Sequence, residues 1–156
     1  MLTKLVASFG LTFAAPLIGS LFTTREAISD WYAGLNRPFF TPPAWLFGPV
    51  WTILYALMAL SAFIIWQKGL GSAAVKIALG LYIAQLALNA LWTPLFFGLQ
   101  MPLLAFVEIL LLWLAILGTI WAFSTVSTPA ALLLMPYLLW TTFAAVLNGS
   151  IWLLNR

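Results

Sequence analysis

Long stretches without a charged side chain dominate the sequence. Residues 5–24, 38–67, 77–107 and 109–155 contain no Asp, Glu, Lys or Arg. A helix that crosses a bilayer needs about 20 predominantly apolar residues, so each of the first three stretches predicts one span. The last stretch is long enough for two spans. Its Ser and Thr residues just before Pro129 divide it, because such a cluster followed by proline starts a helix rather than continuing one.

The sequence therefore predicts a single all-α integral membrane domain over residues 1–156. It is a bundle of five transmembrane helices at about residues 5–22, 45–66, 77–97, 102–123 and 130–152. The first segment also has the layout of a signal peptide, with Lys4 ahead of an apolar run, although that run continues without a small-x-small cleavage site. Alternating helices place the 23–44 connection, the 98–101 turn and the C-terminus on one face of the membrane. Each face then carries three cations, so the positive-inside rule gives no orientation.

Composition excludes several classes of protein. The chain is 65% apolar and 6% charged, whereas soluble domains carry about a quarter charged residues, so the lipid bilayer is its surroundings. The sequence contains no His and no Cys, which excludes disulfides, zinc sites, thiolate nucleophiles and imidazole bases. We therefore expect no metal site and no required cofactor. The net charge of +3 comes from so few groups that it gives no support to a nucleic-acid partner.

One connection is much longer than the others. Residues 23–44 contain Arg25, Glu26, Asp30 and Arg37, together with four aromatic side chains and three prolines. A long loop of this composition in a protein with few loops is typical of a lid or a binding loop. Trp31 and Tyr32 taken alone fit equally well with aromatic residues that collect at the membrane interface.

Aromatic and amide side chains recur at helical spacing within the predicted spans. The three stripes are Trp51, Tyr55 and Met58; Tyr82, Gln85, Asn89 and Trp92; and Tyr137, Trp140, Ala144 and Asn148. An unpaired amide in hydrocarbon costs several kcal/mol, so Gln85 and Asn89 must face the bundle interior. Hydrogen bonds between helices explain the amides alone. The inward indoles instead favour an aromatic-walled pocket for a small molecule, because tight membrane packing prefers small residues.

Two further features carry weaker signals. Glu108 lies within the fourth span, where a carboxyl group is costly and often functional. Because no other acidic, basic or imidazole side chain lies in any span, a structural hydrogen bond or a bound cation is a better interpretation than acid–base chemistry. Gly80 and Ala84 form a small-xxx-small pair that could seat a second copy of the chain.

Several linked motifs resemble those of the translocator protein or tryptophan-rich sensory protein (TspO) family. They run in order and at family-like spacing from about residue 16 to residue 152: Trp31-Tyr32, Leu35-Asn36-Arg37-Pro38, Pro42-Pro43, Trp51-x-x-x-Tyr55, Asn89-x-x-Trp92-x-Pro94-x-Phe96-Phe97-Gly98, Pro136-Tyr137-x-x-Trp140 and Leu147-Asn148.

The resemblance implies a five-helix bundle, usually a homodimer, that binds porphyrins such as protoporphyrin IX. Animal relatives also bind cholesterol and drug-like hydrophobic molecules. In the family the first long loop closes the ligand pocket, which agrees with the lid interpretation of residues 23–44. Carried over by position, the pocket wall comprises Tyr32, Pro42, Trp51, Tyr55, Asn89, Trp92, Trp140 and Ala144. An acidic residue in the fourth helix, as at Glu108, is also similar to the family.

The sequence departs from the family pattern at two places. Phe40 stands where the family often has Trp, which affects contacts at the lid. In the last helix, Gly149 and Leu153 occupy the aromatic and basic positions of the sterol motif of animal members, a weak pattern even when complete. Sterol transport is therefore not expected.

The leading hypothesis is a receptor-type or sensor-type membrane protein that binds a flat tetrapyrrole between Trp51 and Trp140, oriented by Asn89. Arg37 or Arg25 would pair with the porphyrin propionates. An alternative implied by some bacterial relatives is light-dependent porphyrin oxidation, in which Trp51 and Trp140 would be the catalytic residues. Tetrapyrrole transport is a third alternative with less support, because the sequence has no paired intramembrane charges and no inverted repeat.

Overall fold

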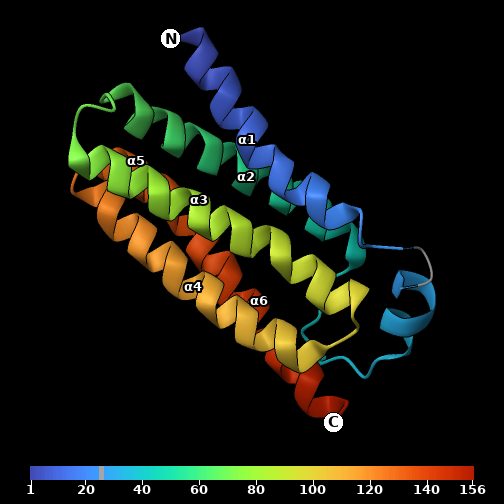
Figure 1. Ribbon diagram of the computed structural model, residues 1–156. Coiled ribbons are helices and arrows are strands. Elements are labelled where there is room, and N and C mark those ends of the chain that lie inside the picture. Colours follow the sequence, from blue (N-terminus) through green and yellow to red (C-terminus); the bar gives the residue numbers. More distant parts are fainter. Residues whose placement is uncertain (25–26) are drawn as a thin grey trace.

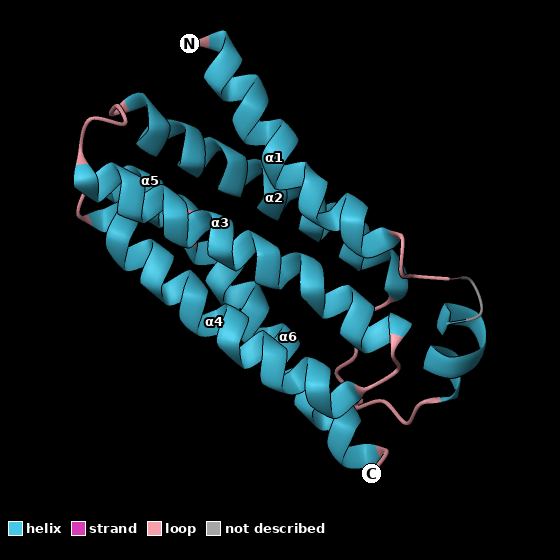
Figure 2. Cartoon of the chain, viewed as in Figure 1, coloured by secondary structure: helices cyan, strands magenta, loops and turns pink. Residues whose placement is uncertain are grey.

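The structure, a computed structural model, describes residues 1–24 and 27–156 as helices joined by short connections (Figures 1 and 2). The long helices are α1 (Leu2–Ser20), α2 (Ala44–Gln67), α3 (Ala73–Thr93), α4 (Pro102–Ser124) and α6 (Met135–Leu154), and α5 (Thr128–Leu133) is a single short helix ahead of α6. Two π-helical segments, Ala27–Tyr32 and Pro94–Gly98, lie at one end of the bundle.

Five helical stretches among the described residues are long and apolar enough to cross a membrane. They are Leu2–Ser20, Ala44–Gln67, Ala73–Gly98, Pro102–Ser124 and Thr128–Leu154. This confirms the predicted all-α membrane fold, with helix ends that differ from the predicted ones by a few residues. The protein is an integral membrane protein.

The helices pack in an up-and-down arrangement. α3 lies along α4, α4 along α6, and α1 against α2 and α3. The N-terminus, the α2–α3 loop and the α4–α5 loop lie at one end, and the segment Ala27–Tyr32, the α3–α4 turn and the C-terminus lie at the other (Figure 1). This agrees with the sides predicted from alternation. Below, the second end is called the lid end.

Regular α-helix is interrupted at two prolines, Pro94 and Pro136. Pro94 has no N–H for the carbonyl of Ala90, and the chain widens into the π-helical turn Pro94–Gly98, closed by the bond from Leu99 N to Pro94 O at 2.8 Å. The fifth span was predicted as one continuous helix, but it is interrupted at Leu134, two residues before Pro136. Pro136 has no N–H to donate to the carbonyl of Leu132, which accounts for this break.

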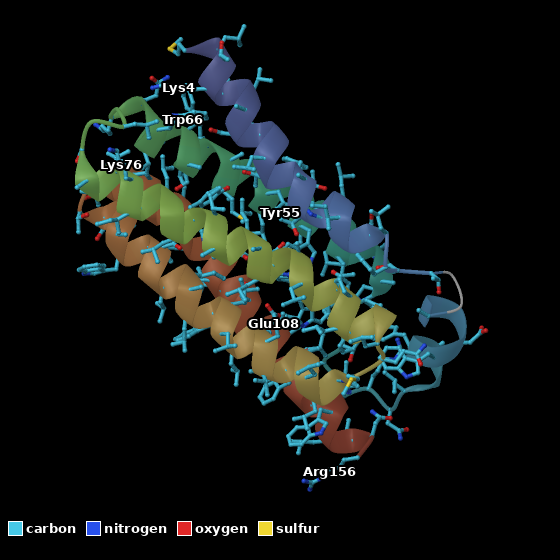
Figure 3. All side chains as sticks on the ribbon, in the orientation of Figure 1. Lys4, Tyr55, Trp66, Lys76, Glu108 and Arg156 are labelled. Carbon is cyan, nitrogen blue, oxygen red and sulfur yellow. The ribbon has the colours of Figure 1, made fainter. Side chains whose placement is uncertain are left out.

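Polar side chains within the spans join helices. The hydroxyl groups of Thr12 on α1 and Tyr82 on α3 are hydrogen-bonded at 2.7 Å, and Ser61 on α2 donates to the carbonyl of Ala130 on α5 at 2.6 Å. At the end opposite the lid, Lys4 Nζ donates to the carbonyl of Trp66 at 3.0 Å (Figure 3). These bonds satisfy groups that lipid cannot satisfy. Those of Thr12 and Lys4 hold α1 against α3 and α2, and that of Ser61 joins α2 to α5.

Candidate ligand site

A chain of hydrogen bonds crosses the middle of the bundle. Tyr55 on α2 donates to Asn89 Oδ1 on α3 at 2.7 Å, and Asn89 Nδ2 donates to the Tyr137 hydroxyl on α6 at 3.0 Å. The Tyr137 hydroxyl donates in turn to Gln85 Oε1 at 3.1 Å. All four side chains are buried. Gln85 and Asn89 therefore face inward, as predicted, and Asn89 joins three spans.

Trp51 packs on this hydrogen-bonded group. Its ring stacks on Tyr55 at a centroid distance of 5.3 Å and an interplanar angle of 27°, and it meets Tyr137 edge-on at 6.1 Å. The structure thus brings together three residues of the predicted wall, Trp51, Tyr55 and Asn89. We call Trp51, Tyr55, Gln85, Asn89 and Tyr137 the central cluster.

Trp140 lies between α2 and the connection of residues 27–43, which we call the lid loop. Its ring centroid is 5.9 Å from Phe47 and 5.4 Å from Phe143, and Phe143 is 6.3 Å from Phe40 of the loop. The indole N–H of Trp140 is buried and has no hydrogen-bond partner among the described residues. Buried donors are nearly always paired in native proteins, so this N–H is free to meet an acceptor. Ala144, one turn further along α6, is half-buried against the same core.

Trp92 is held from two sides. Its indole N–H donates to Asn148 Oδ1 at 3.0 Å, while Asn148 Nδ2 donates to the carbonyl of Pro102 at 2.8 Å. The Trp92 ring stacks on Phe96 at 4.9 Å and 16°. Trp92 packs against both hydrophobic cores of the protein, so it links the central cluster to the lid end.

The lid loop places Tyr32 against the π-helical turn. Tyr32 lies 6.1 Å from Phe96 and 5.7 Å from Phe97, and the Arg37 guanidinium lies 5.3 Å from the Tyr32 ring. Tyr32 is therefore part of an aromatic group that covers the end of α3. We call Trp31, Tyr32, Trp92, Phe96 and Phe97 the lid cluster.

Pro42 occupies a different environment from the rest of the predicted wall. It lines a hollow of about 480 Å³ formed by residues of the loop itself: Leu35, Asn36, Arg37, Pro38, Thr41, Pro42, Pro43 and Ala44. Arg37 lines the same hollow. Arg25, the other arginine expected to meet a propionate, lies outside the described residues.

Several residues that the structure brings to this region carry no sequence signal that assigns them to the pocket wall. Tyr137 belongs to a helical stripe of the sequence and is not among the residues of the predicted wall, yet it contacts both Trp51 and Asn89. Phe47 and Phe143 had no polar or motif signal, and their contacts with Trp140 depend on how α2 and α6 pack. Only the three-dimensional arrangement identifies them.

Glu108 is 4% exposed, and neither carboxyl oxygen has a hydrogen-bond partner among the described residues. Figure 3 places it within the body of the bundle, away from both ends. The structural hydrogen bond suggested from the sequence is therefore not present among the described residues, and α4 carries the carboxyl group inside the bundle.

Gly149 faces the neighbouring helix α4. A Cβ atom at this position would lie 2.8 Å from Cε2 of Phe106, so the Phe106 ring occupies the space that a larger residue would need. An aromatic side chain, which animal sterol motifs require here, fits only if Phe106 moves. The glycine that replaces the aromatic residue of the sterol motif therefore matches the position of the Phe106 ring on α4.

Comparison with known proteins covers nearly the whole chain. The sequence profile of the TspO/MBR family matches residues 8–153. The chain belongs to the TspO/MBR family. A tryptophan-rich protein TspO from Archaeoglobus fulgidus is 46% identical over 153 residues, covering 97% of both chains. The human translocator protein is 43% identical, covering 94% of this chain and 89% of its own, and a tryptophan-rich sensory protein from Cereibacter sphaeroides is 42% identical, covering 93% and 90%.

Membership of the TspO/MBR family confirms the resemblance drawn from the sequence motifs. The matched region contains every residue of the central cluster and of the lid cluster. Family membership and the five spans together make this a TspO-type membrane bundle.

Proposed function

We propose that this protein binds porphyrins and related flat hydrophobic molecules within the membrane, between the central cluster and the lid loop. The observation that carries the proposal is the convergence of Trp51, Tyr55 and Tyr137 on the buried amide of Asn89. Aromatic walls with a few fixed polar groups are the usual form of a small-molecule site. A flat ring would insert between these side chains, exchanging ring-to-ring contacts for contacts with the ligand.

Two polar features support a ligand with hydrogen-bond acceptors and negative charge. The Trp140 N–H, which has no partner in the part of the chain that the structure describes, could donate to a ring nitrogen or a carbonyl group. Arg37 is exposed beside the Tyr32 ring at the lid end, where a propionate reaching the membrane surface would meet it. Arg37→Gln should therefore weaken binding of protoporphyrin IX and leave binding of its dimethyl ester unchanged. Equal loss for both ligands would contradict this pairing.

The residues present favour a metal-free ring. The sequence has no His and no Cys, which are common axial ligands of haem iron. Binding would rest on stacking and hydrogen bonds, so we expect protoporphyrin IX to compete effectively with haem.

Porphyrin titration of the purified protein tests the proposal. The porphyrin's own absorbance reports binding, so loss of a tryptophan does not remove the signal. Stacking and a lost hydrogen bond each contribute about 1 kcal/mol, so Trp51→Phe and Trp140→Phe should each raise the Kd about 3- to 20-fold. Trp121→Phe is the matched control, because Trp121 is 69% exposed on α4. If Trp51→Phe and Trp140→Phe both bound porphyrin as tightly as the original chain, the proposed site would be wrong.

Light-dependent porphyrin oxidation is a second candidate. The ring of Trp51 packs against Tyr55 and Tyr137. If an excited porphyrin takes an electron from the Trp51 indole, these two phenols can share the resulting electron hole. Illumination of the complex in air distinguishes the two functions. Porphyrin absorbance that decays faster with the original chain than with Trp51→Phe or Trp140→Phe supports oxidation, and equal decay at equal occupancy supports binding alone.

We also propose that the protein forms a homodimer through α3. Gly80 and Ala84 are exposed on one helix face one turn apart, and the space beside Gly80 is open. Small residues let helix backbones approach closely in membranes, so this face suits a second copy of the chain.

A further inference from the structure

The lid loop is tied to the end of α6 by a pair of hydrogen bonds. Asn36 N donates to Asn155 Oδ1 at 2.9 Å, and Asn155 Nδ2 donates to Asn36 O at 2.9 Å. The side-chain amide of Asn155 thus pairs with a backbone amide of the loop, 119 residues away in sequence, in the manner of two paired peptide groups. Neither bond uses the side chain of Asn36.

Asn155 is itself held in position. Asn155 Nδ2 also donates to the carbonyl of Ile151 at 2.7 Å, and its backbone N–H donates to the carbonyl of Trp152 at 3.2 Å. Both donors of the side-chain amide and its oxygen are therefore used. The same helix carries Asn148, which is bonded to Trp92 and Pro102, so the loop is fastened to a fixed point.

The tied segment leads directly to the residues that cover the proposed pocket. Arg37 follows Asn36 and stacks on Tyr32, which packs on Phe96 and Phe97. On the other side of the loop, Phe40 meets Phe143, next to Trp140. Releasing Asn36 would free the loop between these two aromatic contacts.

We propose that Asn155 is a positioning residue that latches the lid loop over the ligand pocket and slows the departure of bound ligand. This inference rests on the proposed function. Among the described residues Asn155 has no hydrogen bond to the predicted wall, and it acts through the backbone of Asn36. Because the latch is exposed to water, its bonds are of modest strength. We expect Asn155→Ala to raise the ligand dissociation rate about 3- to 10-fold, with little change in the association rate.

Three variants separate the latch from general structural damage. Asn155→Ala removes both bonds to the loop. Asn155→Asp keeps an acceptor for the Asn36 N–H and loses the donor. Its amide exchange rate and its ligand release rate should therefore lie between those of Asn155→Ala and those of the original chain. Asn36→Ala keeps both bonds, since only its backbone takes part, and should behave like the original chain.

Two measurements test the proposal on the full-length protein in micelles. Amide hydrogen exchange at residues 35–37, without ligand, should be faster in Asn155→Ala and unchanged in Asn36→Ala. The rate at which protoporphyrin IX is released into excess serum albumin should likewise be higher in Asn155→Ala and unchanged in Asn36→Ala. Unchanged exchange in Asn155→Ala would overturn the latch, and faster exchange with an unchanged release rate would overturn its role in ligand retention. If the original chain retains no porphyrin, the proposed function fails, while the exchange measurement still decides whether the latch exists.

Discussion

Asn89 joins α3 to both α2 and α6 by hydrogen bonds, so replacing it with Leu is an informative perturbation. Leu has the same number and branching of side-chain heavy atoms as Asn, and none of its side-chain atoms is polar. The Tyr137 hydroxyl keeps Gln85 Oε1 as its acceptor at 3.1 Å. The Tyr55 hydroxyl, by contrast, loses the acceptor that lies 2.7 Å away and stays buried.

The size of the effect follows from this one orphaned hydroxyl. A buried hydroxyl without a partner costs about 1–3 kcal/mol, and hydrogen bonds between membrane helices average about 0.6 and reach about 1.7 kcal/mol. We therefore expect Asn89→Leu to lower the free energy of unfolding by about 1–2 kcal/mol. Reversible unfolding in mixed detergent micelles, followed by circular dichroism, measures this change.

A double-mutant cycle shows whether the reasoning is right. Tyr55→Phe removes the hydroxyl, so the loss in Asn89→Leu/Tyr55→Phe should be smaller than the sum of the single losses by about 1 kcal/mol. Thr52→Val is a control on the same helix, because Thr52 is exposed and bonds only within its own turn, and it should change stability by less than about 0.5 kcal/mol. Strictly additive losses at positions 55 and 89 would refute the account of the central cluster.

The remaining predictions concern helix contacts outside the central cluster. Thr12→Val should destabilise the bundle by about 1–2 kcal/mol in the same unfolding assay, because the buried Tyr82 hydroxyl loses its partner at 2.7 Å. Adding Tyr82→Phe to this variant should restore part of the lost stability. A double variant that loses the full effect of both substitutions would argue against this bond. Gly149→Tyr should destabilise the protein by about 1–3 kcal/mol, since Phe106 must move, and should not increase retention of radiolabelled cholesterol; tight sterol binding by this variant would contradict the packing argument. Gly80→Leu should convert the dimer to a monomer in sedimentation analysis in detergent while leaving porphyrin affinity unchanged, and a dimer that persists would place the contact on another face.

The sequence predicts the five spans and much of the site, for separate physical reasons. Charge-free stretches of span length leave little choice of element, and a buried amide such as Asn89 must face inward, so both predictions follow from the cost of polar groups in lipid. The interruption at Leu134 is harder to foresee, because prolines are tolerated inside membrane helices and only neighbouring contacts decide whether one ends a helix.

Contacts that depend on helix packing are beyond a single-sequence analysis. Phe47 meets Trp140 only because α2 and α6 lie side by side at that level. The pairing of Asn36 with Asn155 joins two polar residues 119 positions apart in the sequence, and no local pattern marks either one as a partner. Pro42 illustrates the opposite case, since its motif is clear but its side chain lines a hollow of the loop.

The central claim, that a flat ring lies between Trp51 and Trp140, is tested most directly by using the nine tryptophans as reporters. Labelling with 5-fluorotryptophan gives one ¹⁹F resonance per indole, assigned by single Trp→Phe variants, and manganese protoporphyrin IX broadens the resonances near the bound ring. We predict that the Trp51 and Trp140 signals broaden first, while those of Trp121 and of Trp66, at the end of the bundle opposite the lid, stay sharp. Broadening of Trp66 or Trp121 with Trp51 and Trp140 unaffected would contradict the proposed site.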